Sequence, residues 1–200
     1  MRIIRIYLKS YILLYRSKLK YVMKFLAVLD YDFFGRDYLN VAEIVAPCAE
    51  LIWFRIKNIP NDEILFHAEK LRKLLPHSKL ILSQNPVIAQ KACFDGVHLN
   101  SRCQKPEEVK KLFPHLIIGY SAHSVQECIS VESHYKTLSP IFKVNKPYET
   151  KPLGLIKSPC ENVYALGGIT AENFSLIKNC GFYGIAGIRL CLEINNIRLK

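Results

Sequence analysis

Beyond residue 22 the chain alternates short apolar segments with stretches of helical periodicity. Apolar runs of four to seven residues between turn signals are typical of buried strands, and apolar residues spaced three and four apart are typical of amphipathic helices. Their regular alternation predicts a parallel sheet built from βα units. We expect eight strands, near residues 24–30, 50–55, 79–83, 95–99, 116–120, 135–139, 162–166 and 184–187. Residues 23–200 then form units of about 22 residues each, which predicts a compact (β/α)8 barrel, a TIM barrel, in one domain.

The expected helices have recognisable start and stop signals. Asn61 is placed to cap the helix after the second strand, and Pro106 stands where a helix would begin. Thr170 is placed to cap a helix that ends at Gly181. These signals support the alternation of strands and helices.

His123 lies at the turn between the fifth strand and the helix that follows it. Ser124 and Glu127 have the S-x-x-E spacing of a capping box, so that helix is predicted to begin at once. In parallel α/β folds, ligands bind at the carboxyl ends of the strands, where such turns lie. An imidazole there suits a general base and a structural hydrogen-bonding role equally well, and the residues alone leave both open.

Residues 1–22 differ from the rest of the chain and predict a basic amphipathic helix. Their longest uncharged run, residues 10–15, is too short to span a bilayer, and no signal-peptide pattern is present. Three interpretations stay open: a helix on a membrane surface, a helix packed on the barrel or a second subunit, or an upstream start-site artefact with Met23 as the true beginning. The last two are favoured, because a strand begins directly after Met23.

The formal net charge of +11 is concentrated at the N-terminus. Removing residues 1–22 leaves +5, which is spread along the chain without a recognised nucleic-acid-binding motif. We therefore expect no nucleic-acid partner.

The seven cysteines are odd in number and contain no C-x-x-C pair. This excludes a zinc ribbon and a disulfide framework as the expected arrangement. Most cysteines, such as Cys93 and Cys128, stand in apolar stretches. We expect reduced core cysteines in a cytoplasmic protein.

Several groups near the expected strand ends suit an anion. Arg55 and Lys57 lie on one face of the second strand, where they could bind a phosphate or pair with a carboxylate of a neighbouring strand. Gly167-Gly168 follows the seventh strand and residues 187–189 follow the eighth. Backbone N–H groups at these two turns form the usual phosphate site of such barrels.

Two further sets of residues are ambiguous. Lys143, Lys146 and Lys151 follow the sixth strand, in a loop that suits a lid or a solvated surface equally well. His98 ends the fourth strand, and we favour a hydrogen-bonded core residue over a ligand-binding one.

Seven short motifs follow one another along the chain: Trp53-Phe-Arg-Ile-Lys, Asp95-Gly-Val-His-Leu, Ile118-Gly-Tyr-Ser-Ala-His-Ser, Ser139-Pro-Ile-Phe, Lys146-Pro, Leu166-Gly-Gly-Ile and Gly184-Ile-Ala-Gly-Ile. With these motifs in this order, the chain resembles the thiamine phosphate synthase/TenI family. The resemblance implies a (β/α)8 barrel and a role in thiamine biosynthesis.

The resemblance is incomplete in the part that serves the synthases. Family synthases join a hydroxymethylpyrimidine diphosphate to a thiazole phosphate, with magnesium bound by two aspartates. Here Ser83-Gln84 stands at the first of these positions, and the second falls near Cys103. Trp53 replaces a family glutamine and Arg189 a family serine. We therefore expect no metal cofactor, and magnesium only if the chain is a divergent synthase.

The TenI branch, whose similarity extends to residues 113–119, uses the histidine that matches His123 to move a proton in the aromatisation of a carboxythiazole phosphate. The resemblance thus implies a thiazole tautomerase that acts on a small phosphorylated thiazole, with His123 as the base and Arg55 on the carboxylate. A divergent synthase and a non-catalytic phosphate-ligand binder are the alternatives. A homodimer is compatible with the sequence, and contact with a membrane surface is not expected. The remaining implied substrate and phosphate contacts are Lys57, Ser121, Lys146, Gly167, Gly168, Gly187, Ile188 and Arg189.

Overall fold

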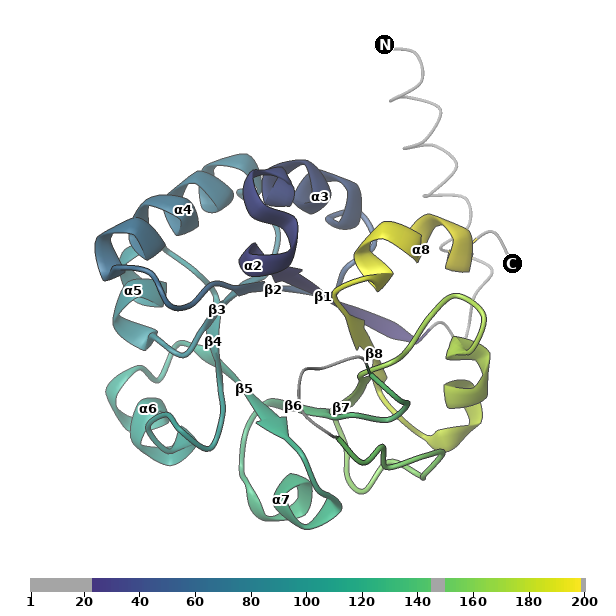
Figure 1. The fold of residues 1–200 in the computed structure, drawn as a ribbon. Helices are drawn as coiled ribbons and strands as arrows, with labels where there is room; N and C mark the ends of the chain where they lie inside the picture. The colour runs from purple at the N-terminus through teal and green to yellow at the C-terminus, as the bar shows by residue number, and fades with distance from the viewer. Residues whose placement is uncertain (1–22, 145–149, 199–200) are drawn as a thin grey trace.

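The computed structural model, which describes residues 23–144 and 150–198, is a closed barrel of parallel strands (Figure 1). Each strand pairs with its sequence neighbours, and β8 pairs with β1. The predicted fold is confirmed, and each predicted strand overlaps an observed one. The strands are β1 (Lys24–Asp30), β2 (Leu51–Arg55), β3 (Leu80–Ser83), β4 (Gly96–Leu99), β5 (Ile117–Ala122), β6 (Tyr135–Leu138), β7 (Val163–Leu166) and β8 (Gly184–Gly187).

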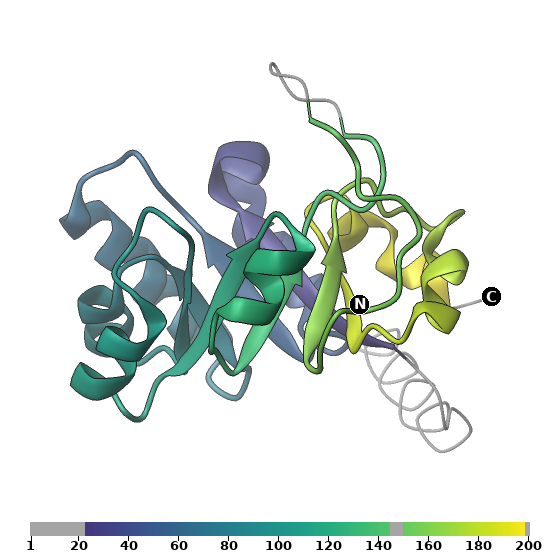
Figure 2. The ribbon, with the colours of Figure 1, turned by 90° about the horizontal axis from the view of Figure 1, so that it is seen from below.

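The helices lie outside the ring of strands (Figure 1). Between β6 and β7 the described residues form no helix, and this connection projects beyond one end of the barrel (Figure 2). The helices are α2 (Tyr31–Phe34), α3 (Tyr38–Val45), α4 (Asn61–Leu74), α5 (Pro86–Lys91), α6 (Pro106–Leu112), α7 (Val125–Ser130) and α8 (Leu190–Arg198), with 3-10 turns at Gly35–Asp37 and Phe174–Cys180.

Alternation along the strands creates two apolar cores. The larger lies between the strands and the helices, and the smaller, which includes Trp53, Tyr135 and Tyr164, fills the barrel. Continuing the alternation toward the carboxyl ends of the strands brings polar side chains to the inner face: Asp30, Arg55, Ser83, His98, Ser121 and Thr137. This polar end of the barrel is where the candidate residues converge.

Two of the predicted helix caps are wrong in detail. Asn61 is the first residue of α4 and follows an N-cap at Pro60, so it does not cap this helix. Thr170 accepts a hydrogen bond from the Glu172 N–H at 3.3 Å, but the segment that follows is a 3-10 helix with Asn173 at its N-cap. Gly181 ends that segment with a positive φ of 74°, as predicted.

Two other predictions concern the chain end and the cysteines. Residues 1–22 lie outside the described residues, so the interpretations of that segment stay predictions. None of the described helices is long and apolar enough to cross a membrane. All seven cysteines are free thiols, but Cys93 is exposed, which corrects its expected place in the core.

Candidate active site

His123 follows β5 directly, and its ring has a defined orientation. Its Nδ1 lies 3.1 Å from the Ser139 carbonyl oxygen and 3.2 Å from the Ser139 Oγ. A carbonyl can only accept, so Nδ1 carries the proton and donates it. The neutral ring then has its lone pair on Nε2, for which the described residues provide no hydrogen-bond partner. His123 is exposed, so this nitrogen is available as a proton acceptor.

Glu127 on α7 supports the backbone of His123. Its two carboxylate oxygens accept hydrogen bonds from the His123 N–H at 2.7 Å and from the Tyr120 hydroxyl at 2.8 Å. Ser124 caps α7 by accepting from the Glu127 N–H at 3.1 Å, as predicted. The second hydrogen bond of a capping box, from the Ser124 N–H to the Glu127 side chain, is not formed. The Glu127 carboxylate accepts from the N–H of His123 in its place, so this part of the prediction is wrong. Burial, followed by the Glu127 carboxylate, raises the pKa of Tyr120 to about 12, so its hydroxyl remains a donor.

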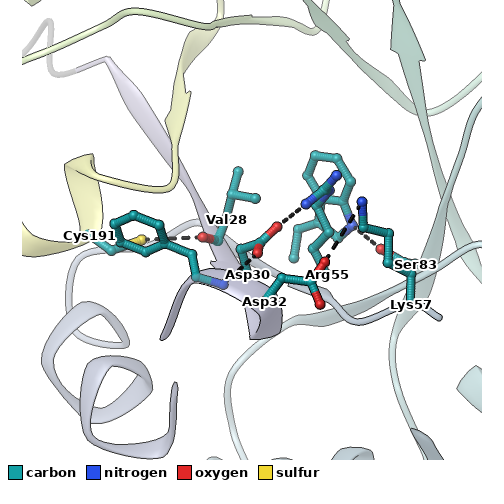
Figure 3. A network of polar contacts seen from close by, with 9 residues as sticks. Val28, Asp30, Asp32, Arg55, Lys57, Ser83 and Cys191 are labelled. Carbon is teal, nitrogen blue, oxygen red and sulfur yellow. Dashed lines mark hydrogen bonds and ion pairs between the residues drawn. The ribbon is translucent and has the colours of Figure 1, made fainter. Parts of the chain in front are cut away.

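Arg55 and Lys57 each have a carboxylate partner (Figure 3). The Arg55 guanidinium pairs with Asp30, which lies directly opposite it on β1 and is 2% exposed. Asp30 also accepts from the Phe33 N–H at 2.9 Å and so caps α2. Lys57 lies 3.8 Å from Asp32. The structure thus shows the carboxylate pairing that the sequence left open, and a guanidinium with five N–H donors still has others for a ligand.

His98 is a buried, hydrogen-bonded residue, which is the role that the sequence favoured. Its ring stacks on Trp53, with centroids 3.8 Å apart, and its Nδ1 lies 2.9 Å from the Tyr135 hydroxyl. Its Nε2 lies 2.9 Å from the Ser121 Oγ. Ser121, which was predicted to contact the substrate, is therefore hydrogen-bonded to a protein side chain. Trp53 in turn donates to the Ser83 Oγ at 2.9 Å. These five linked side chains lie together inside this end of the barrel.

Gly119 explains how this cluster fits. A Cβ built there would lie 2.2 Å from the Tyr135 ring and 2.5 Å from the His98 Nδ1. The glycine motif of β5 therefore provides space for the two rings. Sequence reasoning missed this role, because neither ring is a neighbour of Gly119 along the chain.

Burial, with a smaller contribution from Arg55, lowers the pKa of His98 to about 3. In the unfolded chain this histidine takes up a proton near pH 6.5. The contribution of neutral His98 to the free energy of unfolding should therefore be fully present above that pH and decrease as the pH falls toward 3. The slope from this group is about 1.4 kcal/mol per pH unit. We expect His98→Asn to show a shallower loss of unfolding free energy between pH 7 and pH 5, measured by urea denaturation. Equal slopes in both proteins would contradict the buried, neutral state of His98.

The Gly167-Gly168 turn packs closely against the start of the β6–β7 connection. The Ile141 N–H donates to the Leu166 carbonyl at 2.9 Å, and the Phe142 N–H donates to the Gly167 carbonyl at 3.0 Å. Both glycines have positive φ, 94° and 68°, and a Cβ at Gly168 would lie 2.6 Å from the Lys143 carbonyl oxygen. The turn thus brings the connection over the ends of β6 and β7.

This close packing gives a testable difference between two glycines. Gly154 also has a positive φ, 78°, but a Cβ there would meet nothing within 4 Å. Gly154→Ala should therefore cost only the conformational strain, about 1 kcal/mol. Gly168→Ala adds the clash and should cost about 2–4 kcal/mol in total. Urea unfolding of the two variants measures the difference, and equal losses would show that the turn does not hold the connection.

The other predicted phosphate residues follow β8. Gly187 is the last residue of β8, and α8 begins at Leu190. A Cβ at Gly187 would lie 2.8 Å from the Leu190 side chain. Ile188 is half-buried, and the exposed Arg189 has its guanidinium 6.0 Å from the Phe33 ring centroid. Lys146 lies outside the described residues, so its predicted role stays a prediction.

The side chains at this end of the barrel do not fit the magnesium site that the resemblance implies for synthases. Ser83 accepts from Trp53, and Asn100 accepts from the Arg102 N–H at 2.9 Å. The two aspartates nearby, Asp30 and Asp32, pair with cations. Residues 23–144 and 150–198 contain no group of three or more His, Cys, Asp or Glu that could hold a metal ion. Magnesium is usually held by one or two carboxylates together with water and substrate phosphates, and both nearby carboxylates are already paired with cations.

Comparisons with known proteins identify one family for this barrel. The family model described as thiamine monophosphate synthase, TMP-TENI, matches residues 26–190. A putative thiamine-phosphate synthase 2 from Aquifex aeolicus is 35% identical over 84% of this chain and 96% of that protein. A thiamine-phosphate synthase from Methanococcus vannielii is 29% identical over 88% of this chain and 90% of that protein.

Solved structures lead to the same family. A thiamine phosphate pyrophosphorylase from Pyrococcus furiosus superimposes with a TM-score of 0.72 and 26% identity, covering 91% of this chain and 93% of that one. A phosphoribosylanthranilate isomerase from the same organism, at 15% identity and a TM-score of 0.59, shares the fold alone. The chain therefore belongs to the thiamine monophosphate synthase/TenI family, whose barrel enzymes act in thiamine biosynthesis.

Proposed function

We propose that this chain is a TenI-like thiazole tautomerase, which aromatises a carboxythiazole phosphate by proton transfer without a metal ion. The observation that supports it most is the hydrogen bond from the His123 Nδ1 to the Ser139 carbonyl, 3.1 Å long. This bond selects the tautomer in which Nε2 is a base at the carboxyl end of β5.

In this mechanism His123 Nε2 takes a proton from a ring carbon of the substrate. The resulting imidazolium keeps its Nδ1–H on the Ser139 carbonyl, which stabilises the positive charge. The same Nε2–H then returns a proton to another carbon of the same molecule, and the aromatic ring forms. Glu127 contributes by holding the His123 backbone at 2.7 Å, so the base stays at one position.

The two anionic groups of the substrate have basic and backbone partners at the same end of the barrel. We assign the carboxylate to Arg55, which pairs with Asp30 and has further N–H donors, and we add Lys57 and Ser121 as further proposed contacts of the substrate. We assign the phosphate to the turns at Gly167-Gly168 and residues 187–189, which are the turns after β7 and β8. Lys146 completes the proposed phosphate contacts.

A divergent thiamine phosphate synthase is the second candidate, and the names of the relatives favour it. That reaction needs space for a second, pyrimidine substrate and a site for its diphosphate. The Trp53–His98 stack fills the middle of the barrel, and the nearby donor set does not fit magnesium. These two observations are our reasons for proposing the tautomerase first.

One paired assay on the full chain separates the candidates. In EDTA, the non-aromatic carboxythiazole phosphate is mixed with the protein and its aromatisation is followed by NMR. In magnesium, both synthase substrates are supplied and thiamine phosphate is measured. We expect acceleration in the first reaction only. Thiamine phosphate formation would establish the synthase, whereas thiazole phosphate binding by calorimetry with neither reaction would establish a non-catalytic binder.

A further inference from the structure

Cys128 and Cys160 come together although they are 32 residues apart in the chain. Their sulfur atoms lie 3.9 Å apart, and the Cys160 Sγ also lies 3.6 Å from the Cys128 carbonyl oxygen. Cys128 is in the middle of α7, and Cys160 lies in the segment that leads back to β7 without helical structure. A disulfide needs sulfur atoms about 2.05 Å apart, so a shift of about 2 Å would join them.

The surroundings make the two thiols unequal. Cys160 is half-buried, whereas Cys128 is 0% exposed. The Lys136 ammonium on β6 lies 3.6 Å from the Cys160 Sγ, where it stabilises negative charge on that sulfur. Burial, followed by the Cys160 thiol, raises the pKa of Cys128 to about 12, so Cys128 stays protonated at neutral pH. Cys160 is therefore the sulfur that an oxidant reaches first.

We propose that Cys128 and Cys160 form a reversible intrachain disulfide when the protein meets a peroxide. The Cys160 thiolate attacks one oxygen of hydrogen peroxide, which breaks the O–O bond, releases hydroxide and leaves a sulfenic acid. The Cys128 sulfur then attacks the Cys160 sulfur, the S–S bond forms as the S–O bond breaks, and the Cys128 thiol proton passes to the departing hydroxyl, which leaves as water. Two thiols are oxidised and one peroxide is reduced to two waters. This proposal does not depend on the proposed function.

The disulfide would add a covalent link between α7 and the segment that precedes β7. Cys128 directly follows Glu127, whose carboxylate holds the backbone of His123. Cys160 belongs to the segment that takes the place of a helix after β6. Oxidation would tie this segment to α7, and the closed loop should raise the thermal midpoint by roughly 5–10 °C.

Peptide mapping of the full chain tests the proposal directly. The protein is treated with hydrogen peroxide, and its remaining thiols are alkylated under denaturing conditions. The masses of the tryptic peptides are then measured by mass spectrometry. Trypsin places Cys128 in residues 112–136, Cys160 in residues 158–178 and Cys180 in residues 179–189, so each pairing has its own mass. We expect the 112–136 and 158–178 peptides to be linked in most molecules and released by dithiothreitol. A link from Cys160 to Cys180, or oxidation of the exposed Cys93 without any link, would overturn the proposal.

Variants identify the order of the steps. Cys128→Ala should leave a sulfenic acid at Cys160, which a dimedone probe labels, and Cys160→Ser should remove both label and link. Lys136→Met should slow linkage several-fold, and Cys93→Ser is the matched control with wild-type linkage. Circular dichroism checks that each variant is folded. Because the wild-type map needs no variant, a Cys128→Ala protein that fails to fold leaves the test intact.

Discussion

His123→Ala is expected to lower kcat for aromatisation of the carboxythiazole phosphate by about 100- to 10,000-fold, the usual contribution of a positioned general base. The side chain is exposed and its one described partner group is Ser139, so the variant should keep its fold and its affinity for the product. NMR of the reaction gives the rate, and calorimetry with the aromatic product gives the affinity.

His115→Ala is the matched control, since His115 is also exposed but lies before β5, at the opposite end of that strand. It should retain wild-type kcat. If both variants lose activity equally, the loss is a general effect of the substitutions and His123 is not the base. If His123→Ala keeps full activity, the assignment of the base is wrong.

Arg55→Met is expected to lower the free energy of unfolding by about 3 kcal/mol. The reason is that Asp30, which is only 2% exposed, would keep a buried carboxylate without its cation. For a chain of this size the thermal midpoint should fall by roughly 10 °C. Urea denaturation at neutral pH gives the free energy.

Lys57→Met provides the comparison, because the Lys57 and Asp32 side chains are 37% and 51% exposed and such pairs contribute at most about 1 kcal/mol. The double variant Arg55→Met, Asp30→Asn should recover part of the stability, since no charge is left buried. If Arg55→Met loses as little free energy of unfolding as Lys57→Met, Arg55 is not needed to stabilise Asp30, and its main role is not in the stability of the fold.

The barrel could be predicted from sequence because its signal is local and repeated. Each buried strand is a short apolar run, and most strands are followed by a helix with its own periodicity, so the eight strands could be counted without knowledge of their contacts. The turn at His123 could be predicted for the same reason, since Ser124 caps α7 within three residues. Asn61 failed as a cap because Pro60, which lies just before it, takes the N-cap position.

The contacts that shape the candidate site could not be predicted in the same way. Asp30 ends β1 and meets Arg55 through the register of two parallel strands, which fixes a partner 25 residues away. Knowing that register in advance would have identified the pair. The space that Gly119 leaves for His98 and Tyr135 depends on three strands at once. Likewise, the buried Thr137 hydroxyl, which lacks a partner among the described residues, is visible only in the folded barrel.

The most direct test of the account is the rate of aromatisation in EDTA with the full chain and with His123→Ala, measured side by side by NMR. The account predicts clear acceleration over buffer by the wild type and a loss of about 100-fold or more in the variant. Acceleration that requires magnesium, or a wild-type rate equal to that of buffer, would contradict it.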